Sequence, residues 1–189
     1  DTELFTINSE KSKHFTFLHV STLNNSVKNV SGIIKAFNNV KDKNCKLKII
    51  GDGETDWIFE MVKKYQLENR VLIEGEKTYE EIAYEMQMAN VFILFSNIEN
   101  LPLVLIEAIS TGLPTIATKV GGIPEIYDTE LGLLIDKKDI NSLVNSMNYM
   151  LDNYLDYNSQ NIRNYAIKYF SYSQISNQFN QLYEQMVLQ

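Results

Sequence analysis

Short runs of apolar residues alternate along the chain with longer segments in which apolar residues recur every three or four positions. Short continuous runs are typical of buried strands, and the longer spacing is typical of amphipathic helices. The runs that predict strands are residues 14–20, 47–50, 71–73, 91–95, 115–117 and 132–135. Strands that alternate with helices favour an α/β fold. We expect a doubly wound parallel sheet of about six strands with helices on both faces.

Three segments between these strands carry one apolar stripe each at helical spacing. The stripes are Val30, Ile33, Ile34, Phe37 and Val40; Ile58, Met61, Val62 and Tyr65; and Ile140, Leu143, Val144, Met147, Met150, Leu151 and Tyr154. We interpret the Met and Tyr members as core residues. Thr78 followed by Glu81 predicts a capping box that opens a fourth helix, which ends near Ala89.

The length of 189 residues fits one domain with a buried core, and 44% apolar and 22% charged residues are ordinary for a globular protein. Residues 1–13 are polar and aperiodic and read as a linker or boundary remnant. Residues 14–160 form the predicted α/β domain. Residues 161–189 read as a C-terminal helical tail of the same domain, rich in aromatic side chains.

Charge and cysteine content exclude some classes of partner. A net charge of −7 argues against nucleic acid as the main partner, because a phosphate backbone needs a clustered basic surface. Cys45 is the sole cysteine, so no intrachain disulfide can form, which fits a reducing compartment. No apolar run reaches the length of a membrane span, and the N-terminus shows no signal-peptide pattern. We expect a cytoplasmic protein.

The segment after the fourth predicted strand carries the strongest chemical signal. Glu99 and Glu107 are separated by seven residues, with Pro102 between them. Proline suits the first residue of a helix, so the amides of Leu101, Leu103 and Val104 would be free to bind an anion. Glu107 would lie in the second turn, where a carboxylate with two acceptor oxygens suits a vicinal diol. Its apolar neighbours argue against an ordinary surface glutamate.

This segment, continued by Gly112-Leu113-Pro114 and by residues 121–125, resembles the glutamate-x7-glutamate signature of retaining glycosyltransferases with two facing Rossmann-like domains. These are GT-B enzymes of family 4, the glycosyl transferases of group 1. The resemblance covers most of the chain and matches only the donor-binding half of such an enzyme.

The resemblance implies a nucleotide diphosphate sugar as donor and an acceptor-binding N-terminal domain as the missing partner. It implies transfer of the sugar to an acceptor hydroxyl, in glycan or polysaccharide biosynthesis, without a metal or cofactor. Any membrane contact, peripheral to the inner face, would belong to the missing half. The fragment alone would be inactive.

The resemblance also assigns roles to single residues. Glu99 would orient the donor sugar and Glu107 the ribose, whereas Lys28 and the amides of Leu101 and Leu103 would bind the diphosphate. Glu99 and Lys28 are then the expected catalytic residues. The family pattern before this lysine is glycine-arginine-leucine, and here Thr22 stands at the arginine position in a loop about one residue longer. We therefore expect one phosphate contact to be missing or to be supplied by another residue.

Two further loops are candidates for donor contacts. Gly51 and Gly53 follow the second predicted strand, where glycine permits close approach of a ligand to the backbone. Lys77 and Thr78 follow the third, where relatives hold the base. Residues 121–125 form a predicted tight turn, for which a structural role and a role near the sugar are equally supported.

Other functions have weaker support. Gly51 and Gly53 superficially suggest a dinucleotide fingerprint, but it follows the wrong strand and lacks its third glycine. His14 and His19, five residues apart, would face opposite sides of a strand, so a shared metal is not expected. The open alternatives are a GT-B epimerase or phosphorylase, a non-catalytic nucleotide-sugar-binding module, and a nicotinamide-binding domain.

Overall fold

The computed structural model describes residues 1–8 and 10–187, and within them one sheet of six parallel strands has the order β3-β2-β1-β4-β5-β6. The strands are β1 (Thr16–Val20), β2 (Lys46–Ile50), β3 (Val71–Glu74), β4 (Val91–Leu94), β5 (Thr115–Thr118) and β6 (Gly132–Ile135). The order reverses between β1 and β4, which are neighbours in the sheet. The predicted doubly wound parallel sheet is confirmed.

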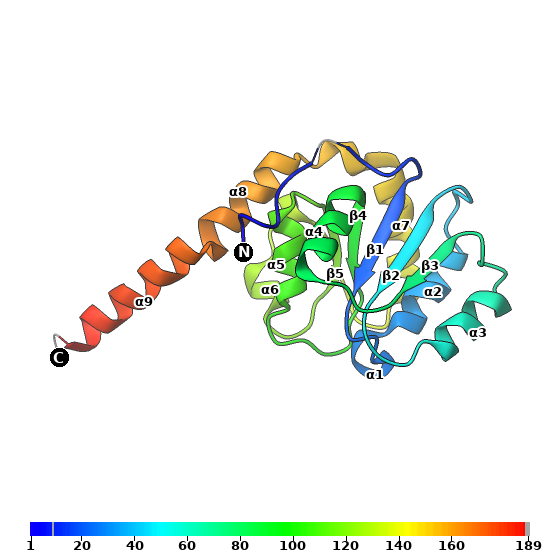
Figure 1. The fold of residues 1–189 in the computed structure, drawn as a ribbon, viewed down its shortest axis with the longest axis horizontal. Coiled ribbons are helices and arrows are strands. Elements are labelled where there is room, and N and C mark those ends of the chain that lie inside the picture. The colour runs from blue at the N-terminus through cyan, green and yellow to red at the C-terminus, as the bar shows by residue number, and fades with distance from the viewer. Residues whose placement is uncertain (9, 188–189) are drawn as a thin grey trace.

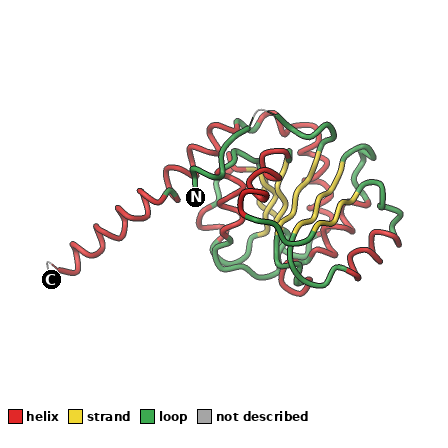
Figure 2. Tube along the Cα trace, in the orientation of Figure 1, coloured by secondary structure: helices red, strands yellow, loops and turns green. Residues whose placement is uncertain are grey.

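Helices cover both faces of this sheet (Figures 1 and 2). They are α1 (Asn25–Lys28), α2 (Val30–Asn38), α3 (Asp56–Lys64), α4 (Tyr79–Met88), α5 (Leu103–Ser110), α6 (Ile123–Ile126), α7 (Ile140–Asn153), α8 (Ser159–Phe170) and α9 (Tyr172–Val187), with 3₁₀ turns at Thr129–Leu131 and Tyr154–Asp156. One hydrophobic cluster joins α2, α3 and α7 to one face of the sheet. A second joins α4, α5 and α6 to the other. The apolar stripes predicted for α2, α3 and α7 contribute to the first cluster, as expected.

The ends of several elements differ from the sequence prediction by one or two residues. β1 begins at Thr16 and not at residue 14, because the Thr16 hydroxyl donates to the carbonyl of His14 and its amide donates to Asn90 Oδ1. The capping box of α4 is confirmed: Thr78 accepts from the Glu81 amide, and Glu81 accepts from the Thr78 amide.

The N-terminal segment lies on the domain. Phe5 is buried in the second cluster. Arg163 of α8 donates to the carbonyls of Phe5 and Thr2, and also to that of Ser110 at the end of α5. Whether residues 1–13 mark a domain boundary stays a prediction, but residues 1–5 are held by side-chain contacts to the body.

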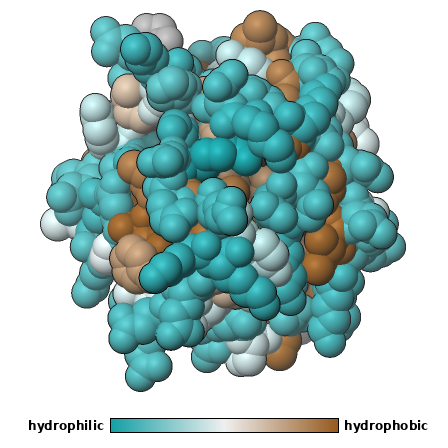
Figure 3. Space-filling view, turned by 90° about the vertical axis from the view of Figure 1, so that its right-hand side faces the viewer, coloured by the Kyte–Doolittle hydropathy of each residue, from teal (hydrophilic) through white to brown (hydrophobic). Residues whose placement is uncertain are grey.

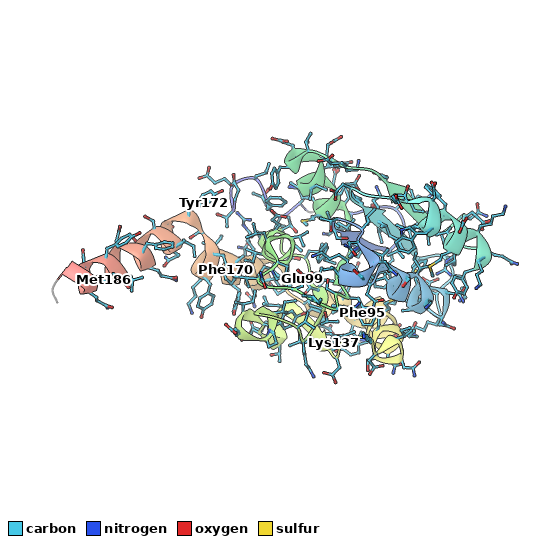
Figure 4. The ribbon with its side chains drawn as sticks, turned by 90° about the horizontal axis from the view of Figure 1, so that it is seen from below. Phe95, Glu99, Lys137, Phe170, Tyr172 and Met186 are labelled. Atoms are coloured by element: carbon cyan, nitrogen blue, oxygen red, sulfur yellow. The ribbon has the colours of Figure 1, made fainter. Side chains whose placement is uncertain are left out.

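The aromatic tail consists of α8 and α9, which are separated by Ser171. Tyr165, Tyr169 and Phe170 of α8 lie against one another, and the Tyr165 hydroxyl donates to the carbonyl of Ile126. Beyond them α9 leaves the body as a projecting helix, with Tyr172 near its start and Met186 near its end (Figures 1 and 4). Its apolar side chains are exposed: Tyr172, Ile175, Phe179, Leu182, Tyr183 and Met186.

The surface beside α3 and β3 is mostly hydrophilic, with small separate apolar patches (Figure 3). Among the described residues, none of the helices is both long enough and apolar enough for a membrane span.

Candidate functional site

The candidate site lies at the carboxyl ends of β1 and β4, where the strand order reverses. In doubly wound sheets this crevice is where ligands bind. The loop after β1 leads into α1, which ends with Lys28, and the loop after β4 carries Glu99 and leads into α5. Both side chains therefore lie at one edge of the sheet, and Figure 4 views Glu99 from that side.

Lys28 and Glu99 form an ion pair across this switch point, with 2.6 Å between Nζ and Oε1. Their side chains are 16% and 7% exposed, so the pair is shielded from bulk water. The hydroxyl of the buried Ser96 donates to the same Oε1 at 2.6 Å. Among the contacts of the described residues, Glu99 Oε2 takes part in no hydrogen bond, so one carboxylate oxygen remains to accept from a ligand.

The loop that holds Glu99 is clamped from the β5 side. The Thr118 hydroxyl donates to the carbonyl of Ser96 at 2.8 Å, and the Gly122 amide donates to the carbonyl of Asn100 at 2.7 Å. Gly121 has φ +56°, and a Cβ there would lie 1.9 Å from the carbonyl oxygen of Glu99. The tight turn at 121–122 thus holds the Glu99 loop by close backbone contact, which a side chain would prevent.

The start of α5 differs slightly from the prediction. Pro102 was expected as the first helical residue, but it precedes the helix, with φ −74° and ψ 114°, and Leu103 is the first helical residue. The proline ring restricts φ, and the extended ψ places the residue outside the helix. Within the described part of the chain, the amides of Leu101, Leu103 and Val104 donate no backbone hydrogen bond, as the first amides of a helix generally do not.

Glu107 lies one turn after Leu103 on the same helix, so the two side chains share a face. Leu101, Leu103, Ile106 and Glu107 line a groove of about 670 Å³. Its other walls come from the N-terminal segment, the start of α4 and the junction of α8 with α9. Burial raises the pKa of the Glu107 carboxyl because it disfavours the charged carboxylate. A hydroxyl that donates a hydrogen bond to this carboxylate would stabilise it.

Gly51 and Gly53 line a second hollow of about 360 Å³ at the ends of β2 and β3, together with Glu74 and Gly75. A Cβ on Gly51 would lie 1.7 Å from the carbonyl oxygen of Ser21, so the loops after β1 and β2 touch through their backbones. Glycine is needed here for packing between loops, whether or not a ligand also approaches.

Lys77 belongs to a charge network that joins three elements. Lys48 on β2 pairs with Glu74 at 3.1 Å and with Glu85 of α4 at 2.7 Å, and Lys77 pairs with Glu74 at 2.8 Å. These hydrogen bonds outweigh partial burial, so the pKa of Lys48 is raised and that of Glu74 is lowered. Thr78 uses its hydroxyl to cap α4. The expected contact of Lys77 and Thr78 with a base stays a prediction.

The loop after β1 is held by a buried histidine, His19, for which the sequence predicted only that it would share no metal with His14. His19 is fully buried, and burial lowers its pKa to about 4. Nδ1 of the neutral ring donates to the carbonyl of Ile93 at 2.9 Å, so Nε2 accepts from the Ser21 hydroxyl at 2.8 Å. Ser21 Oγ in turn accepts from the Leu23 amide. Thr22, which lies between Ser21 and Leu23 in the chain, is exposed at the edge of the site.

Sequence reasoning missed the residues that hold Lys28 and Glu99 in place. The sequence pattern gave no role to Ser96 or Asn97. Asn97 acts through a hydrogen bond to a backbone carbonyl 71 residues away, which no local pattern reveals, and Ser96 donates to the Glu99 side chain three residues further on. His14 is exposed and His19 is buried. In residues 1–8 and 10–187, His, Cys, Asp and Glu form no group of three or more able to hold a metal.

The sequence model of the glycosyl transferases group 1 matches residues 1–169. The N-acetyl-alpha-D-glucosaminyl L-malate synthase of Bacillus anthracis is 38% identical over 111 residues, which make up 58% of this chain and 28% of that protein. The UDP-Gal:alpha-D-GlcNAc-diphosphoundecaprenol alpha-1,3-galactosyltransferase of Escherichia coli is 32% identical over 144 residues, or 74% of this chain and 37% of that protein. The chain thus spans well under half of either relative.

Among solved structures, the sucrose-phosphate synthase of Thermosynechococcus elongatus superposes with a TM-score of 0.87 at 25% identity. The superposition covers 100% of this chain and 51% of that one. The fold therefore corresponds to one half of a GT-B glycosyltransferase.

Proposed function

Because the chain belongs to the group 1 glycosyltransferases, we propose that it is the donor-binding domain of a retaining enzyme. That enzyme moves a sugar from a nucleotide diphosphate sugar to an acceptor hydroxyl and keeps the anomeric configuration. The names of the two curated relatives, one of which includes UDP-Gal, support a sugar-transfer role.

One observation carries this proposal: Lys28 and Glu99 pair at the switch point of the sheet, next to amides at the start of α5 that donate no backbone hydrogen bond to any described residue. A cation and helix amides together favour a diphosphate. Glu99 Oε2 is oriented for a sugar hydroxyl in this proposal, and Glu107 accepts hydrogen bonds from the ribose. The hollow beside Gly51 and Gly53 and the loop of Lys77 and Thr78 offer further contacts to the nucleoside.

In the proposed reaction the bond between the anomeric carbon and the diphosphate oxygen breaks. The acceptor oxygen attacks from the same face, and its proton passes to the departing phosphate. Lys28 and the amides of Leu101 and Leu103 stabilise the negative charge that develops on that phosphate, without a metal. Groups held in place before the reaction lower the barrier because they need no reorganisation.

The acceptor site belongs to a further domain in this proposal, since the chain spans about half of its structural relative. The chain alone then binds donor and transfers nothing. We place the full enzyme in glycan or polysaccharide biosynthesis on the cytoplasmic side of the membrane.

A second candidate is a non-catalytic nucleotide-sugar-binding module. Thr22, exposed where the family pattern has a phosphate-binding arginine, favours it. The two candidates share the donor site and differ in turnover, so donor hydrolysis or transfer by a longer protein that contains this chain separates them.

The donor site is tested by calorimetric titration with UDP, GDP, ADP and their sugar forms. We expect saturable binding of one base. Glu107→Ala should weaken it about tenfold, as expected for loss of hydrogen bonds to a charged acceptor. Glu60→Ala, an exposed change on α3, is the matched control and should bind as the native chain does.

Absence of binding to every nucleotide by the folded native chain would contradict the proposal. Equal affinities of the Glu107→Ala and Glu60→Ala variants would contradict the role of Glu107. Transfer to a defined acceptor by this chain alone would contradict the need for a second domain.

A further inference from the structure

The helix that carries Lys28 is a single turn. α1 spans only Asn25–Lys28, and a helix this short is not stable without tertiary contacts. Its last carbonyls lack partners within the helix, as at every helix C-terminus. The position of the Lys28 side chain therefore depends on whatever satisfies those carbonyls.

Asn97, from the loop after β4, contacts two of them. Its backbone amide donates to the carbonyl of Val27 at 2.7 Å, and its side-chain Nδ2 donates to the carbonyl of Ser26 at 3.0 Å. These two hydrogen bonds join α1 to the loop that carries Glu99. Asn97 lies two residues before Glu99 in that loop. They cross the same switch point as the Lys28–Glu99 ion pair.

The other end of the Asn97 side chain is left without a partner. Oδ1 is buried, and no described residue donates a hydrogen bond to it. A buried unpaired acceptor costs free energy that an apolar side chain of similar size would avoid. The unpaired Oδ1 therefore does not explain why an amide side chain occupies this position. The hydrogen bond from Nδ2 to the carbonyl of Ser26 does explain it.

From this geometry, and building on the proposed donor site, we propose that Asn97 is a positioning residue for Lys28. Its side chain holds the single turn of α1 so that the Lys28 ammonium stays beside Glu99 and within reach of the donor diphosphate. Asn97 itself touches no substrate. Since Thr22 replaces the arginine of the family pattern, the binding of phosphate depends strongly on where this one lysine lies.

The test compares Asn97→Leu, which removes the amide but keeps the number and branching of the side-chain heavy atoms, with Asn39→Leu. Asn39 Nδ2 also donates to a backbone carbonyl, that of Lys35, but on α2 away from the site. The probes are UDP and uridine, or the corresponding pair for the base that the titration above selects. We expect Asn97→Leu to weaken UDP binding about tenfold and uridine binding less than twofold. The melting temperature should change little, because removal of the unpaired Oδ1 offsets loss of the hydrogen bond to Ser26, and Asn39→Leu should leave both affinities unchanged.

A double variant distinguishes positioning from an independent contact. Lys28→Met alone should weaken UDP binding at least as much as Asn97→Leu. In the Lys28→Met background, Asn97→Leu should change the UDP affinity less than twofold. A full tenfold loss in that background, or an equal loss for uridine, would overturn the proposal.

A second arm needs no donor, so that failure of the proposed function can be recognised separately. The coupling between Lys28→Met and Glu99→Gln is measured by urea unfolding, once with Asn97 and once with Leu at that position. We expect the coupling to disappear in the Asn97→Leu background. If native protein binds no nucleotide, the donor site fails while this arm still decides the positioning role; coupling of equal size in both backgrounds overturns it.

Discussion

At the scale of single residues, His19 shows how a titratable group supports the site without taking part in its chemistry. Its ring is neutral, donates to Ile93 and accepts from Ser21, and so sets the path of the loop that precedes Lys28. Protonation would remove the acceptor at Nε2 and place a charge in a fully buried position. The loop after β1 is therefore sensitive to acid.

We expect the free energy of unfolding to fall as the pH is lowered from 6.5 to about 4. Burial lowers the pKa of His19 from 6.5 to about 4 in the folded state, so the unfolded chain binds more protons across this window. Across this window His19 lowers the free energy of unfolding by up to about 3 kcal/mol relative to its value above pH 6.5. Urea unfolding at several pH values measures it.

The comparison variant is His19→Gln, which cannot titrate there. Its baseline stability is lower, but its slope between pH 6.5 and 4 should be smaller than that of the native chain. The exposed His14 is present in both proteins and does not affect the difference. Identical slopes would show that His19 does not resist protonation.

Sequence reasoning at this scale found the charged residues and missed the residues that hold them. Lys28 and Glu99 were expected at the site, and they meet at 2.6 Å. The direct contact between them was not expected, because it depends on β1 and β4 being neighbours in the sheet. Asn97 was missed for the same reason, since its hydrogen bond to the carbonyl of Ser26 joins the segments after β4 and β1. Ser96 contacts Glu99 only three residues away, but a serine near a glutamate is too common a pattern to predict that contact.

At the scale of elements, the turn between β5 and α6 controls the loop of Glu99. The sequence left residues 121–125 equally open to a structural role and a role near the sugar. The structure shows that Gly121 and Gly122 contact the backbone of Glu99 and Asn100. The turn therefore influences the site only through the position of its backbone, which the two glycines allow to lie close to the Glu99 loop.

We expect Gly121→Ala to weaken nucleotide-sugar binding at least tenfold and to lower stability by about 1 kcal/mol or more. The residue has φ +56°, which is unfavourable for alanine, and the new Cβ would meet the carbonyl oxygen of Glu99. Calorimetric titration and urea unfolding measure the two effects.

Gly75→Ala is the matched control for this change. A Cβ at Gly75 would meet no atom within 4 Å, although Gly75 also follows a strand and lines a hollow. Its stability should stay close to that of the native chain, which separates the steric effect at Gly121 from the general effect of a Gly→Ala change. If Gly121→Ala binds donor as tightly as the native chain does, the clamp does not position Glu99.

Helix and strand types were predicted well where the apolar pattern was long, as in α2 and α7. The single turn of α1 was not predicted, because four residues carry no periodic pattern. Helix starts were recognisable where a side chain caps them, as Thr78 does for α4. The predicted start of α5 was wrong by one residue, because a proline fits equally well just before a helix and at its first position.

At the scale of the whole molecule, the N-terminal segment is part of the packing of the domain. Phe5 is 1% exposed and packs in the hydrophobic cluster of α4 and α5, and Arg163 donates to the carbonyls of Thr2 and of Phe5 itself. The polar composition of residues 1–13 suggested a linker, because one buried aromatic residue in a polar stretch gives no periodic signal.

We expect Phe5→Ala to lower the free energy of unfolding by about 3 to 5 kcal/mol, as for other buried phenylalanines. Urea unfolding of the full chain measures it. Phe59→Ala, at a side chain 53% exposed on α3, should cost far less. Equal small effects of both changes would mean that the N-terminal segment contributes little to the stability of the domain.

The strand order also decides when the site can form during folding. β1 lies in the interior of the sheet but is the first strand along the chain, and β4, its neighbour on one side, follows only after β2 and β3. A growing polypeptide can join β1, β2 and β3 while the other flank of β1 is still bare. Lys28 and Glu99 meet only when that flank closes, and such long-range pairing is slow. Nucleotide binding would then report one of the last steps of folding, and ligand added to a refolding chain should capture the finished domain and leave its early collapse unaffected.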